Sequence, residues 1–507
     1  MAAPSQDSHF EELKWWQQKS VWIMLLLGFS AGIPILLIFS SLSLWLREAG
    51  VAKSSVTFFS WAALGYSFKF IWAPLVDKLP VPFLSRLLGR RRGWLLLAQC
   101  SVISSIIWMA LTDPQNGLTA MALAAVLLGF SSATQDVVID AFRIESANPR
   151  LQAMLSSTYI AGYRVAMIAA GAGALFLAQY FGSTKDVYNY EAWRNTYLCM
   201  AALMSVGIIT TLTIKEPLHE GVDYPYAANE YVRFALVFLV SIAVLVTVFL
   251  ITPSTPKWFS AYPQTLFKFV YSSSVLIAAL VAAIAVARTS LRLNLVNAEM
   301  VYQGYQAPIL DFFKRYSKLA IWVLLLIGFY RVSDIVMGVI ANVFYQDMGY
   351  SKAEIASVTK VFGVVMTIAG SFLGGLLALR FGVMRTLMLG AVLVATTNLL
   401  FMWLAQVDAD ITKLAIVITI DNLSQGIAVA AFIAWLSSLT NVSFTATQYA
   451  IFSSLMTLFP KLIGGYSGTL VESIGYSNFF LFASVLGVPV IVLIYFLSSR
   501  LDVKERV

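Results

Sequence analysis

The chain has 507 residues, of which 59% are hydrophobic and only 12% are charged. Soluble globular proteins carry about 25% charged residues, so this composition excludes a soluble enzyme, a nucleic-acid-binding protein and a disordered scaffold. The formal net charge of +8 belongs to Lys and Arg residues in loops rather than to a nucleic-acid-binding surface. At about 20 apolar residues for each spanning helix, the length leaves room for a dozen or more spans. We therefore predict a polytopic, all-α membrane protein.

Apolar runs of helical length predict fourteen membrane-spanning helices. The polar N-terminal tail ends next to Trp15 and Trp16, which are typical of a membrane interface. Lys and Arg concentrate in alternate loops and in both tails, and the positive-inside rule then places both termini in the cytoplasm. In chain order the predicted spans are 20–46, 55–76, 93–112, 118–141, 152–181, 193–214, 231–252, 265–287, 319–346, 354–379, 384–406, 412–438, 447–471 and 477–499.

An internal repeat relates the first six spans to the last six. The run WIMLLLGF at 22–29 recurs as WVLLLIGF at 322–329. Two parallel six-helix halves are typical of the major facilitator fold, and spans 7 and 8 then form an insert between them. The predicted organisation is a cytoplasmic tail at 1–19, an N-terminal half at 20–217, an inserted helix pair with a cytoplasmic linker at 218–318, a C-terminal half at 319–499 and a cytoplasmic tail at 500–507.

The loop between spans 2 and 3 resembles the charged loop signature of major facilitators. Asp77 lies at the cytoplasmic end of span 2, and Arg90, Arg91 and Arg92 open span 3. In that signature an acid-to-arginine contact latches the cytoplasmic side and breaks as the protein rocks, and we place Asp140 in the same predicted latch. The alternative is that these positive charges only set the topology.

Ionisable side chains inside the predicted spans indicate a functional interior, because charge in hydrocarbon is costly. In a wet central cavity, cations would bind an anionic solute and acids would take up a proton. For any one residue the alternative is an ion pair that only holds helices together, and Asp140 is the strongest such case because Arg143 lies one turn away. These residues are Lys69, Asp136, Asp140, Arg164, Arg331, Asp334, Lys360, Asp421 and Lys461.

The repeat and the spacing of charges along each helix divide these residues into binding and proton-coupling candidates. Arg164 and Lys461 occupy repeat-related positions, because each follows a Ser-Ser pair by the same interval, so they predict a pair of cations that clamps carboxylates at the midplane. Asp421 and then Asp136 are the predicted protonation sites, since neither has a cation within one turn of its own helix. The predicted substrate-binding residues are Gln135, Arg164, Arg331, Asn422, Gln425 and Lys461.

The sequence offers little support for catalysis. GFSAG at 28–32 matches a serine-hydrolase motif, but that motif requires a strand–turn–helix and a histidine base. His9 and His219 both lie in extramembrane segments, and Cys100 and Cys199 fall inside apolar runs. We therefore expect no disulfide framework, no metal site and no cofactor.

Several runs together resemble the muropeptide permease (AmpG) family of the major facilitators. They include KFIWAPLVD at 69–77, LGRRRGWLLLAQ at 88–99, FSSATQDVVIDAFRIE at 130–145, FYRVSD at 329–334 and IDNLSQGIAVAAFIAWL at 420–436. The resemblance implies a bacterial inner-membrane permease that imports anhydro-muropeptides (GlcNAc-anhydroMurNAc with or without a stem peptide) by proton symport. Such import serves peptidoglycan recycling and β-lactamase induction.

The family label agrees with the polar residues found in the spans. A disaccharide needs hydroxyl and amide partners, which Gln135, Asn422 and Gln425 supply, while carboxylates of a stem peptide suit Arg164 and the other cations. Two alternatives stay open: a major-facilitator transporter of another amphipathic anion, and a membrane-bound enzyme of cell-wall metabolism. The expected partners are a small-molecule substrate, protons and the lipid bilayer, with no nucleic acid, and we expect a monomer.

Overall fold

The structure, a computed structural model, describes residues 15–51, 64–147, 151–183, 188–217, 226–252, 265–464 and 467–501. Within these ranges every regular element is a helix. The chain forms two compact units, of which the first comprises Met1–Val76, Pro80–His219 and Phe313–Val507 and the second comprises Asp77–Leu79 and Glu220–Phe312.

Eleven helices within the described residues are long and apolar enough to cross a membrane. This confirms the predicted all-helical membrane protein. The other three predicted spans also fall on helices: 265–287 lies within α15 (Thr265–Arg292), and 447–471 begins on α24 (Thr445–Gly464). The span 55–76 falls on the short helices α5 (Leu64–Phe68), η3 (Lys69–Ile71) and α6 (Ala73–Lys78), and its residues up to 63 lie outside the described part of the chain.

The N-terminal half packs around aromatic rings and closely approaching backbones. Trp45 and Trp193 stack with ring centroids 5.7 Å apart. Gly28 and Gly162 allow two helices to approach, because a Cβ at Gly162 would clash with the backbone oxygen of Leu25. The helices of this half are α2 (Lys19–Ile38), α3 (Ser40–Glu48), α5, η3, α6, α7 (Leu84–Leu88), α8 (Arg90–Ala110), α9 (Leu118–Glu145), α10 (Gln152–Ile168), η5 (Ala169–Gly173), α11 (Ala174–Tyr180), α12 (Tyr190–Leu203) and α13 (Ser205–Thr213).

The C-terminal half has its own aromatic cluster. Phe344 packs edge-on against Phe401 and Phe480, and all three side chains are fully buried. Gly475 has a φ of 76° and kinks α25. Residues with a side chain do not readily adopt this positive φ. The helices of this half are η8 (Ser317–Leu319), α18 (Ala320–Phe329), α19 (Val332–Asp347), α20 (Lys352–Ile355), η9 (Ala356–Phe362), α21 (Gly363–Phe381), α22 (Val383–Leu404), α23 (Ile411–Leu439), η10 (Val442–Phe444), α24, α25 (Ser467–Val485) and α26 (Gly487–Leu501).

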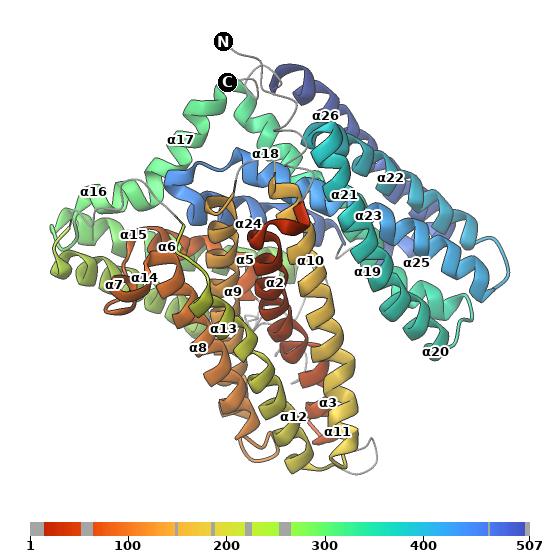
Figure 1. The fold of residues 1–507 in the computed structure, drawn as a ribbon, viewed down its shortest axis with the longest axis horizontal. Helices are drawn as coiled ribbons and strands as arrows, with labels where there is room; N and C mark the ends of the chain where they lie inside the picture. The colour runs from red at the N-terminus through yellow and green to blue at the C-terminus, as the bar shows by residue number, and fades with distance from the viewer. Residues whose placement is uncertain are drawn as a thin grey trace. The chain divides into compact units, whose positions relative to one another are not determined.

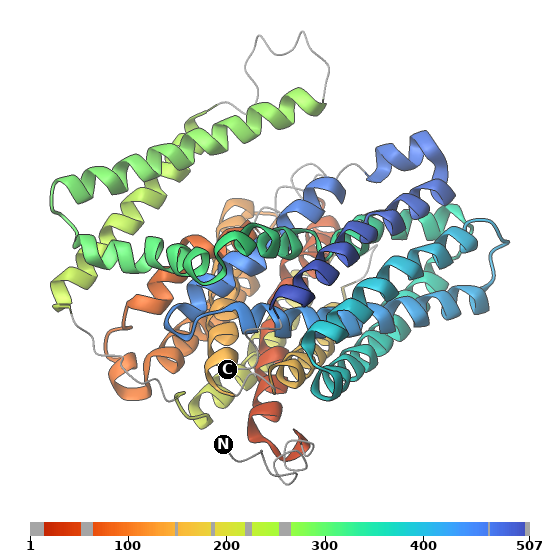
Figure 2. The ribbon, with the colours of Figure 1, turned by 90° about the horizontal axis from the view of Figure 1, so that it is seen from above.

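The second unit contains a helix pair. Its helices α14 (Ala228–Ile251) and α15 lie side by side (Figure 2). Glu230, at the start of α14, accepts a 2.8 Å hydrogen bond from the amide of Asn297, which caps α16 (Ala298–Val301). The π-helical segment η7 (Tyr302–Gln306) and α17 (Ala307–Tyr316) follow, so the chain between α15 and η8, where the cytoplasmic linker is predicted, is largely helical.

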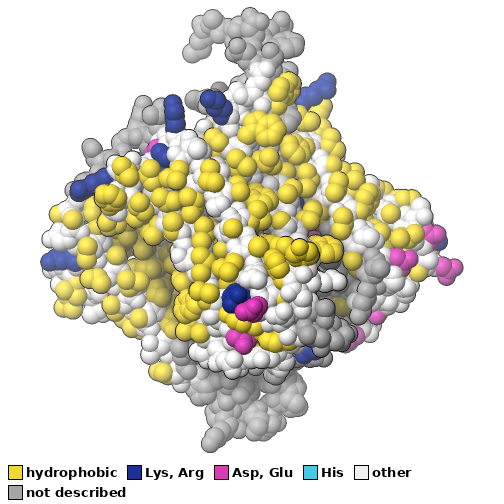
Figure 3. All heavy atoms as spheres, turned by 60° about the horizontal axis from the view of Figure 1, so that its bottom comes forward, with side chains coloured by type: hydrophobic (Ala, Val, Ile, Leu, Met, Phe, Trp, Pro, Cys, Tyr) yellow, Lys and Arg dark blue, Asp and Glu magenta, His cyan; other side chains and the backbone are white. Residues whose placement is uncertain are grey.

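The molecular surface is largely apolar. Hydrophobic side chains cover much of the face seen in Figure 3, and charged side chains are confined to a few spots on it. Large side chains such as Phe176, Ile251 and Tyr495 are more than 70% exposed. A surface of this kind suits a hydrocarbon solvent, where apolar side chains cost nothing to expose.

Candidate functional site

A break in the first helix of the C-terminal half creates the centre of the candidate site. Helix α18 ends at Phe329 and α19 begins at Val332, so Tyr330 and Arg331 lie between two helices. The Tyr330 hydroxyl donates to the carbonyl of Leu387 at 3.1 Å, and its ring stacks on Phe432. Transporters place binding sites at such mid-span breaks, because backbone and side-chain polar groups become available there.

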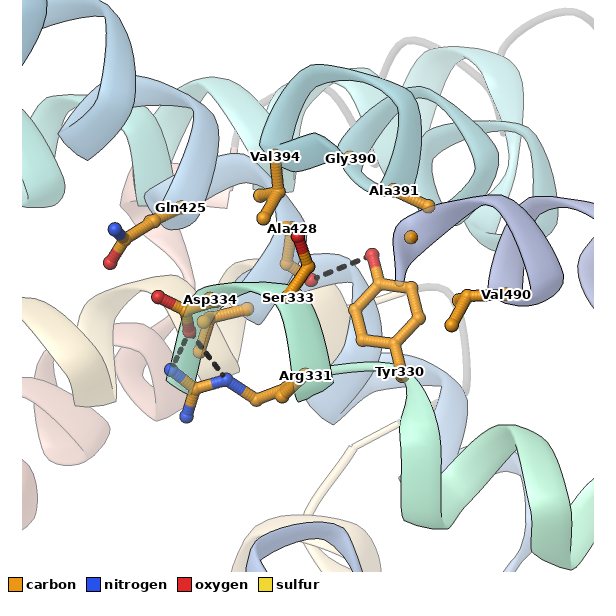
Figure 4. Close-up of a pocket in the computed structure, with 12 residues that line it drawn as sticks. Tyr330, Arg331, Ser333, Asp334, Gly390, Ala391, Val394, Gln425, Ala428 and Val490 are labelled. Atoms are coloured by element: carbon orange, nitrogen blue, oxygen red, sulfur yellow. Dashed lines mark hydrogen bonds and ion pairs between the residues drawn. The ribbon is translucent and has the colours of Figure 1, made fainter. Parts of the chain in front are cut away.

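A small pocket lies beside this break (Figure 4). Arg331 and Asp334 point toward each other in it and form an ion pair, with Arg331 Nε 3.1 Å from the carboxylate. Gln425 lines the same pocket from α23. The pocket therefore combines a cation, an acid and an amide, which together can bind a polar anion.

Asp421 on α23 is almost completely buried. Its carboxylate accepts hydrogen bonds from Thr397 at 3.0 Å and from the Gln425 amide at 2.7 Å. It is also close enough to interact electrostatically with Asp334. Gln425 thus connects a buried acid to the pocket that holds Arg331.

Arg164 lies on α10 of the N-terminal half. Its guanidinium interacts electrostatically with Arg331 and Asp334, and the contact recorded for its Nη1 is the weakly accepting sulfur of Met167 at 3.9 Å. The side chain is partly exposed, as is that of Arg331. Two arginines from different halves therefore lie within electrostatic range of each other, and the predicted pairing of Arg164 with Lys461 stays a prediction.

Two predicted binding residues lie within helix contacts. Gln135 is fully buried in the N-terminal half and donates to the hydroxyl of Ser30 at 3.1 Å. Asn422 accepts a 2.7 Å hydrogen bond from Thr367 of α21. The third, Lys461, belongs to α24, but its side chain lies outside the described residues, so the role assigned to it stays a prediction.

A second acidic cluster occupies the N-terminal half. Asp136 is nearly buried on α9, and Lys69 from η3 interacts with it electrostatically. Lys69 Nζ lies 3.7 Å from the carboxylate of Asp140, one turn further along α9. Arg143 Nη2 lies 3.3 Å from the other oxygen of Asp140. Asp140 therefore lies between two cations and is paired with both.

Arg143 also joins the two halves. Its side chain is fully buried, its Nη1 donates to the hydroxyl of Ser437 on α23 at 2.7 Å, and its guanidinium covers the ring of Tyr449 on α24. The Ser157 hydroxyl on α10 makes another contact of this kind, since it donates to the carbonyl of Ser371 on α21 at 2.6 Å.

A second arginine, Arg91 of α8, also contacts the C-terminal half. Arg91 at the start of α8 forms a 2.6 Å ion pair with Glu145 at the end of α9. It also donates to Thr445 at the start of α24 at 2.6 Å, and Thr445 donates in turn to Glu145. We call the side of the first unit that carries these three residues the Arg91 side.

The two halves meet on the Arg91 side. There α9 packs against α24, and α10 packs against α21 and α23. In Figure 1 the opposite ends of the halves, α11 and α12 in one and α20 in the other, lie well apart. The described contacts therefore close the Arg91 side.

The other predicted latch residues are Asp77, Arg90, Arg92 and Asp140. Arg92 donates to the carbonyls of Thr211 and Leu212 at the end of α13, within its own half. Asp77 is buried and Arg90 is half-buried. Their roles in a latch stay predictions, as does that of Asp140, which pairs instead with Lys69 and Arg143.

Sequence reasoning missed several residues of these contacts. The predicted span 4 ends at 141 and so puts Glu145 in a loop, whereas α9 continues to Glu145. Thr445 and Ser437 are neutral residues near helix ends and carry no signal that distinguishes them from other hydroxyls. Lys69 was noted as a buried cation, but its partner lies on another helix, and spacing along one chain cannot identify such a partner.

Comparison with known proteins identifies the family. The sequence pattern of the Major Facilitator Superfamily matches residues 23–298 and 322–506. The chain belongs to this superfamily. A relative from Rickettsia conorii named "Putative transporter AmpG 4" is 30% identical over 478 residues, which cover 94% of this chain and 96% of the relative. The chain therefore belongs to the AmpG transporter family within the superfamily, as its motifs suggested.

Further relatives and solved structures agree with this assignment. The "Anhydromuropeptide permease" of Escherichia coli strain K12 is 28% identical, and the match covers 97% of this chain and 82% of that protein. The structure of the proton:xylose symporter XylE superposes with a TM-score of 0.59 at 13% identity, over 94% of each chain. The human organic anion transporter MFSD10 superposes with a TM-score of 0.55 at 12% identity, over 94% of this chain and 98% of that one. These structural likenesses confirm the major facilitator fold predicted from the repeat.

Proposed function

We propose that this protein imports anhydro-muropeptides, GlcNAc-anhydroMurNAc with or without a stem peptide, across the bacterial inner membrane in symport with protons. A relative that is matched over nearly the whole chain is named an anhydromuropeptide permease. In this proposal the protein is a transporter rather than an enzyme. It serves peptidoglycan recycling by alternating access between its two halves.

The observation that carries the proposal is the pocket that Arg331, Asp334 and Gln425 line in the C-terminal half, with Arg164 of the N-terminal half within electrostatic range of Arg331. Guanidinium groups bind carboxylates with paired hydrogen bonds, and an amide serves the hydroxyl and acetamido groups of a sugar. Because the two arginines belong to different halves, a bound anion attracts both halves at once. This arrangement supports coupling between substrate binding and rocking of the halves.

Two further features support the proposed direction of transport and the proton as the coupling ion. By the positive-inside rule the Arg91 side faces the cytoplasm, so the described contacts close the cytoplasmic side and leave the opposite side to receive substrate. Buried carboxylates in both halves, Asp421 and Asp136, supply groups that can bind a proton before the halves rock. We place both termini in the cytoplasm and propose that the protein acts as a monomer.

The deciding experiment measures uptake of labelled GlcNAc-anhydroMurNAc into proteoliposomes with an imposed pH gradient. We expect accumulation when the outside is acidic and none when a protonophore collapses the gradient. Absence of uptake in vesicles that contain folded protein would overturn the proposed substrate. Accumulation that survives the protonophore would overturn the proposed coupling.

A transporter of another amphipathic anion is the second candidate, because paired arginines bind any carboxylate. Competition in the same vesicles separates the two candidates. If muropeptides are the substrate, unlabelled GlcNAc-anhydroMurNAc should displace the label, whereas citrate or a fatty acid should not. The reverse order of competition would favour the second candidate.

A further inference from the structure

A chain of four charged side chains connects the acid of the N-terminal half to the contact that closes the Arg91 side. Asp136, Asp140 and Arg143 lie on α9 at intervals of four and three residues, which places them along one face of the helix. Lys69 reaches this face from η3 and interacts with both acids. Arg143 continues the chain across the halves to Ser437 and Tyr449.

We propose that Lys69 and Asp140 are positioning residues that transmit protonation of Asp136 to Arg143 and so release the contact between the halves. This inference rests on the proposed proton symport and names the route by which the proton acts. It concerns residues that the substrate pocket does not contain.

Charge balance within the cluster is the physical basis. With Asp136 ionised, two carboxylates balance Lys69 and Arg143, and the buried cluster is neutral. A proton on Asp136 leaves two cations to share the single carboxylate of Asp140, and an excess charge in a buried, low-dielectric site is strongly unfavourable. In this proposal Arg143 then moves away from the cluster, which breaks its hydrogen bond to Ser437 and its contact with Tyr449.

The surroundings of Asp136 support proton uptake at this position. Its Oδ1 is buried and, among the described residues, has no hydrogen-bond partner. The other titratable groups that face it are the neutral phenols of Tyr66 from α5, Tyr159 and Tyr163 from α10, and Tyr449 from α24. Lys69 and Arg143 are therefore the cations that respond directly to the charge of the two acids.

The test measures the distance between the halves on the Arg91 side as pH changes. Spin labels on Ala147→Cys and Val442→Cys, after Cys100→Ser and Cys199→Ser, report this distance by double electron–electron resonance. In the otherwise native protein we expect the distance to lengthen from alkaline to acidic pH. Asp136→Asn removes one acid permanently and should give the long distance at both pH values.

Charge restoration provides the decisive variant. Asp136→Asn combined with Lys69→Gln leaves Asp140 and Arg143 balanced and should return the short distance at both pH values. Lys69→Gln alone should abolish the pH-dependent change, because protonation then produces a neutral cluster rather than a positive one. A double variant as open as Asp136→Asn, or a native pH response in Lys69→Gln, would overturn the proposal.

Two further variants distinguish a specific effect of charge from a general loss of structure. Asp140→Asn creates the same positive excess without touching Asp136 or Lys69, so it should give the long distance even at alkaline pH, and a short distance there contradicts the proposal. The matched control is Arg194→Gln, which breaks a 3.3 Å ion pair with Glu191 outside the cluster and should keep the native response.

Uptake measured on the same proteins separates this proposal from the proposed function. Native protein that accumulates GlcNAc-anhydroMurNAc without a distance change refutes the transmission and leaves the function intact. Conversely, charge restoration in protein that transports no muropeptide supports the transmission and refutes the substrate.

Discussion

Single side chains in this protein derive their roles from partners on other helices. Arg164 and Arg331 each have a modest set of contacts within their own half, yet they interact with each other across the halves. Arg331 forms an ion pair with Asp334, whereas Nη1 of Arg164 lies 3.9 Å from the weakly accepting sulfur of Met167. Arg164 is therefore the better placed of the two to bind a substrate carboxylate without first giving up an ion pair.

Replacement of this arginine should remove transport and leave the fold intact. Arg164→Ala should weaken muropeptide binding by about 2 kcal/mol, roughly 30-fold, because a charge-assisted hydrogen bond is lost. Arg164→Lys should retain part of the activity, since it keeps the charge and loses the paired donors. Binding and uptake measured with GlcNAc-anhydroMurNAc-peptide check this, with Arg194→Ala as the control. Loss of folded protein in Arg164→Ala would instead indicate a structural role.

Asp421 should behave as a coupling residue. Asp421→Asn mimics the protonated acid and keeps an oxygen to accept from Thr397, so we expect gradient-driven accumulation to stop while substrate exchange across the membrane continues. Both quantities are measured in the same vesicles. Accumulation that persists in this variant would exclude Asp421 as the coupling site, and loss of exchange as well would show that the acid supports the fold.

The burial of Gln135 favours a role in stability over the predicted role in sugar binding. The sequence predicts that it binds the sugar, but the structure places it inside the N-terminal half, fully buried and donating to Ser30. Gln135→Ala should therefore lower the stability of the protein, by about 1 kcal/mol for the lost hydrogen bond and more for the cavity. Thermal unfolding in detergent tests this. An unchanged melting temperature with weaker disaccharide binding would restore the original assignment.

At the scale of helices, close backbone contact holds the N-terminal half together. Helices α2 and α10 approach through Gly28 and Gly162, where a Cβ would clash with backbone oxygens of the facing helix. Arg164 follows two residues after Gly162, so this contact also sets how far α10 presents the arginine. The C-terminal half has a similar approach between α21 and α23, where Gly370 and Gly426 face backbone atoms.

Substitution at this contact should separate the two helices. We expect Gly162→Ala to cost about 1–3 kcal/mol or more, because the clashing atom is backbone and cannot rotate away. Gly338→Ala is the matched control, since a Cβ there meets nothing within 4 Å and α19 is helical at that position. Melting temperatures in detergent compare the two variants. Equal stability would show that α2 and α10 adjust to the added methyl group.

At the scale of the molecule, polar contacts and helix packing together join the two halves on the Arg91 side. Arg91, Glu145 and Thr445 form one polar contact, Arg143 forms a second with Ser437, and Ser157 forms a third with Ser371. Hydrogen bonds and ion pairs of this kind can break and re-form as the halves rock. The arrangement suits alternating access.

Weakening the first contact should open this side. Glu145→Gln removes the charge that holds Arg91, and we expect Ala446, nearly buried between the halves, to become accessible. Reaction of an Ala446→Cys variant with a membrane-impermeant maleimide, applied from the cytoplasmic side, measures the effect in the Cys100→Ser and Cys199→Ser background. Glu191→Gln is the control, since Glu191 forms an ion pair elsewhere. Equal labelling rates in the two variants would contradict this function of the contact.

The sequence by itself determined the fold class, the repeat and the family, because these depend on properties that are local along the chain. Apolar runs must be helical in a membrane, since backbone groups have no water to bind there, and the recurring run at 22–29 and 322–329 marked the two halves. Spacing on one helix also predicted pairs such as Arg331 with Asp334 and Asp140 with Arg143, which the structure contains.

Only the tertiary structure decided which residues meet across helices. Arg164 lies within electrostatic range of Arg331, Lys69 contacts Asp140, and Gln135 donates a hydrogen bond within its own half, although the sequence shows each only as a polar residue in a span. A helix has several faces, and the face that meets the cavity depends on how its neighbours rotate and pack. That rotation is a sum of many small contacts between distant segments, so spacing along one chain does not specify it.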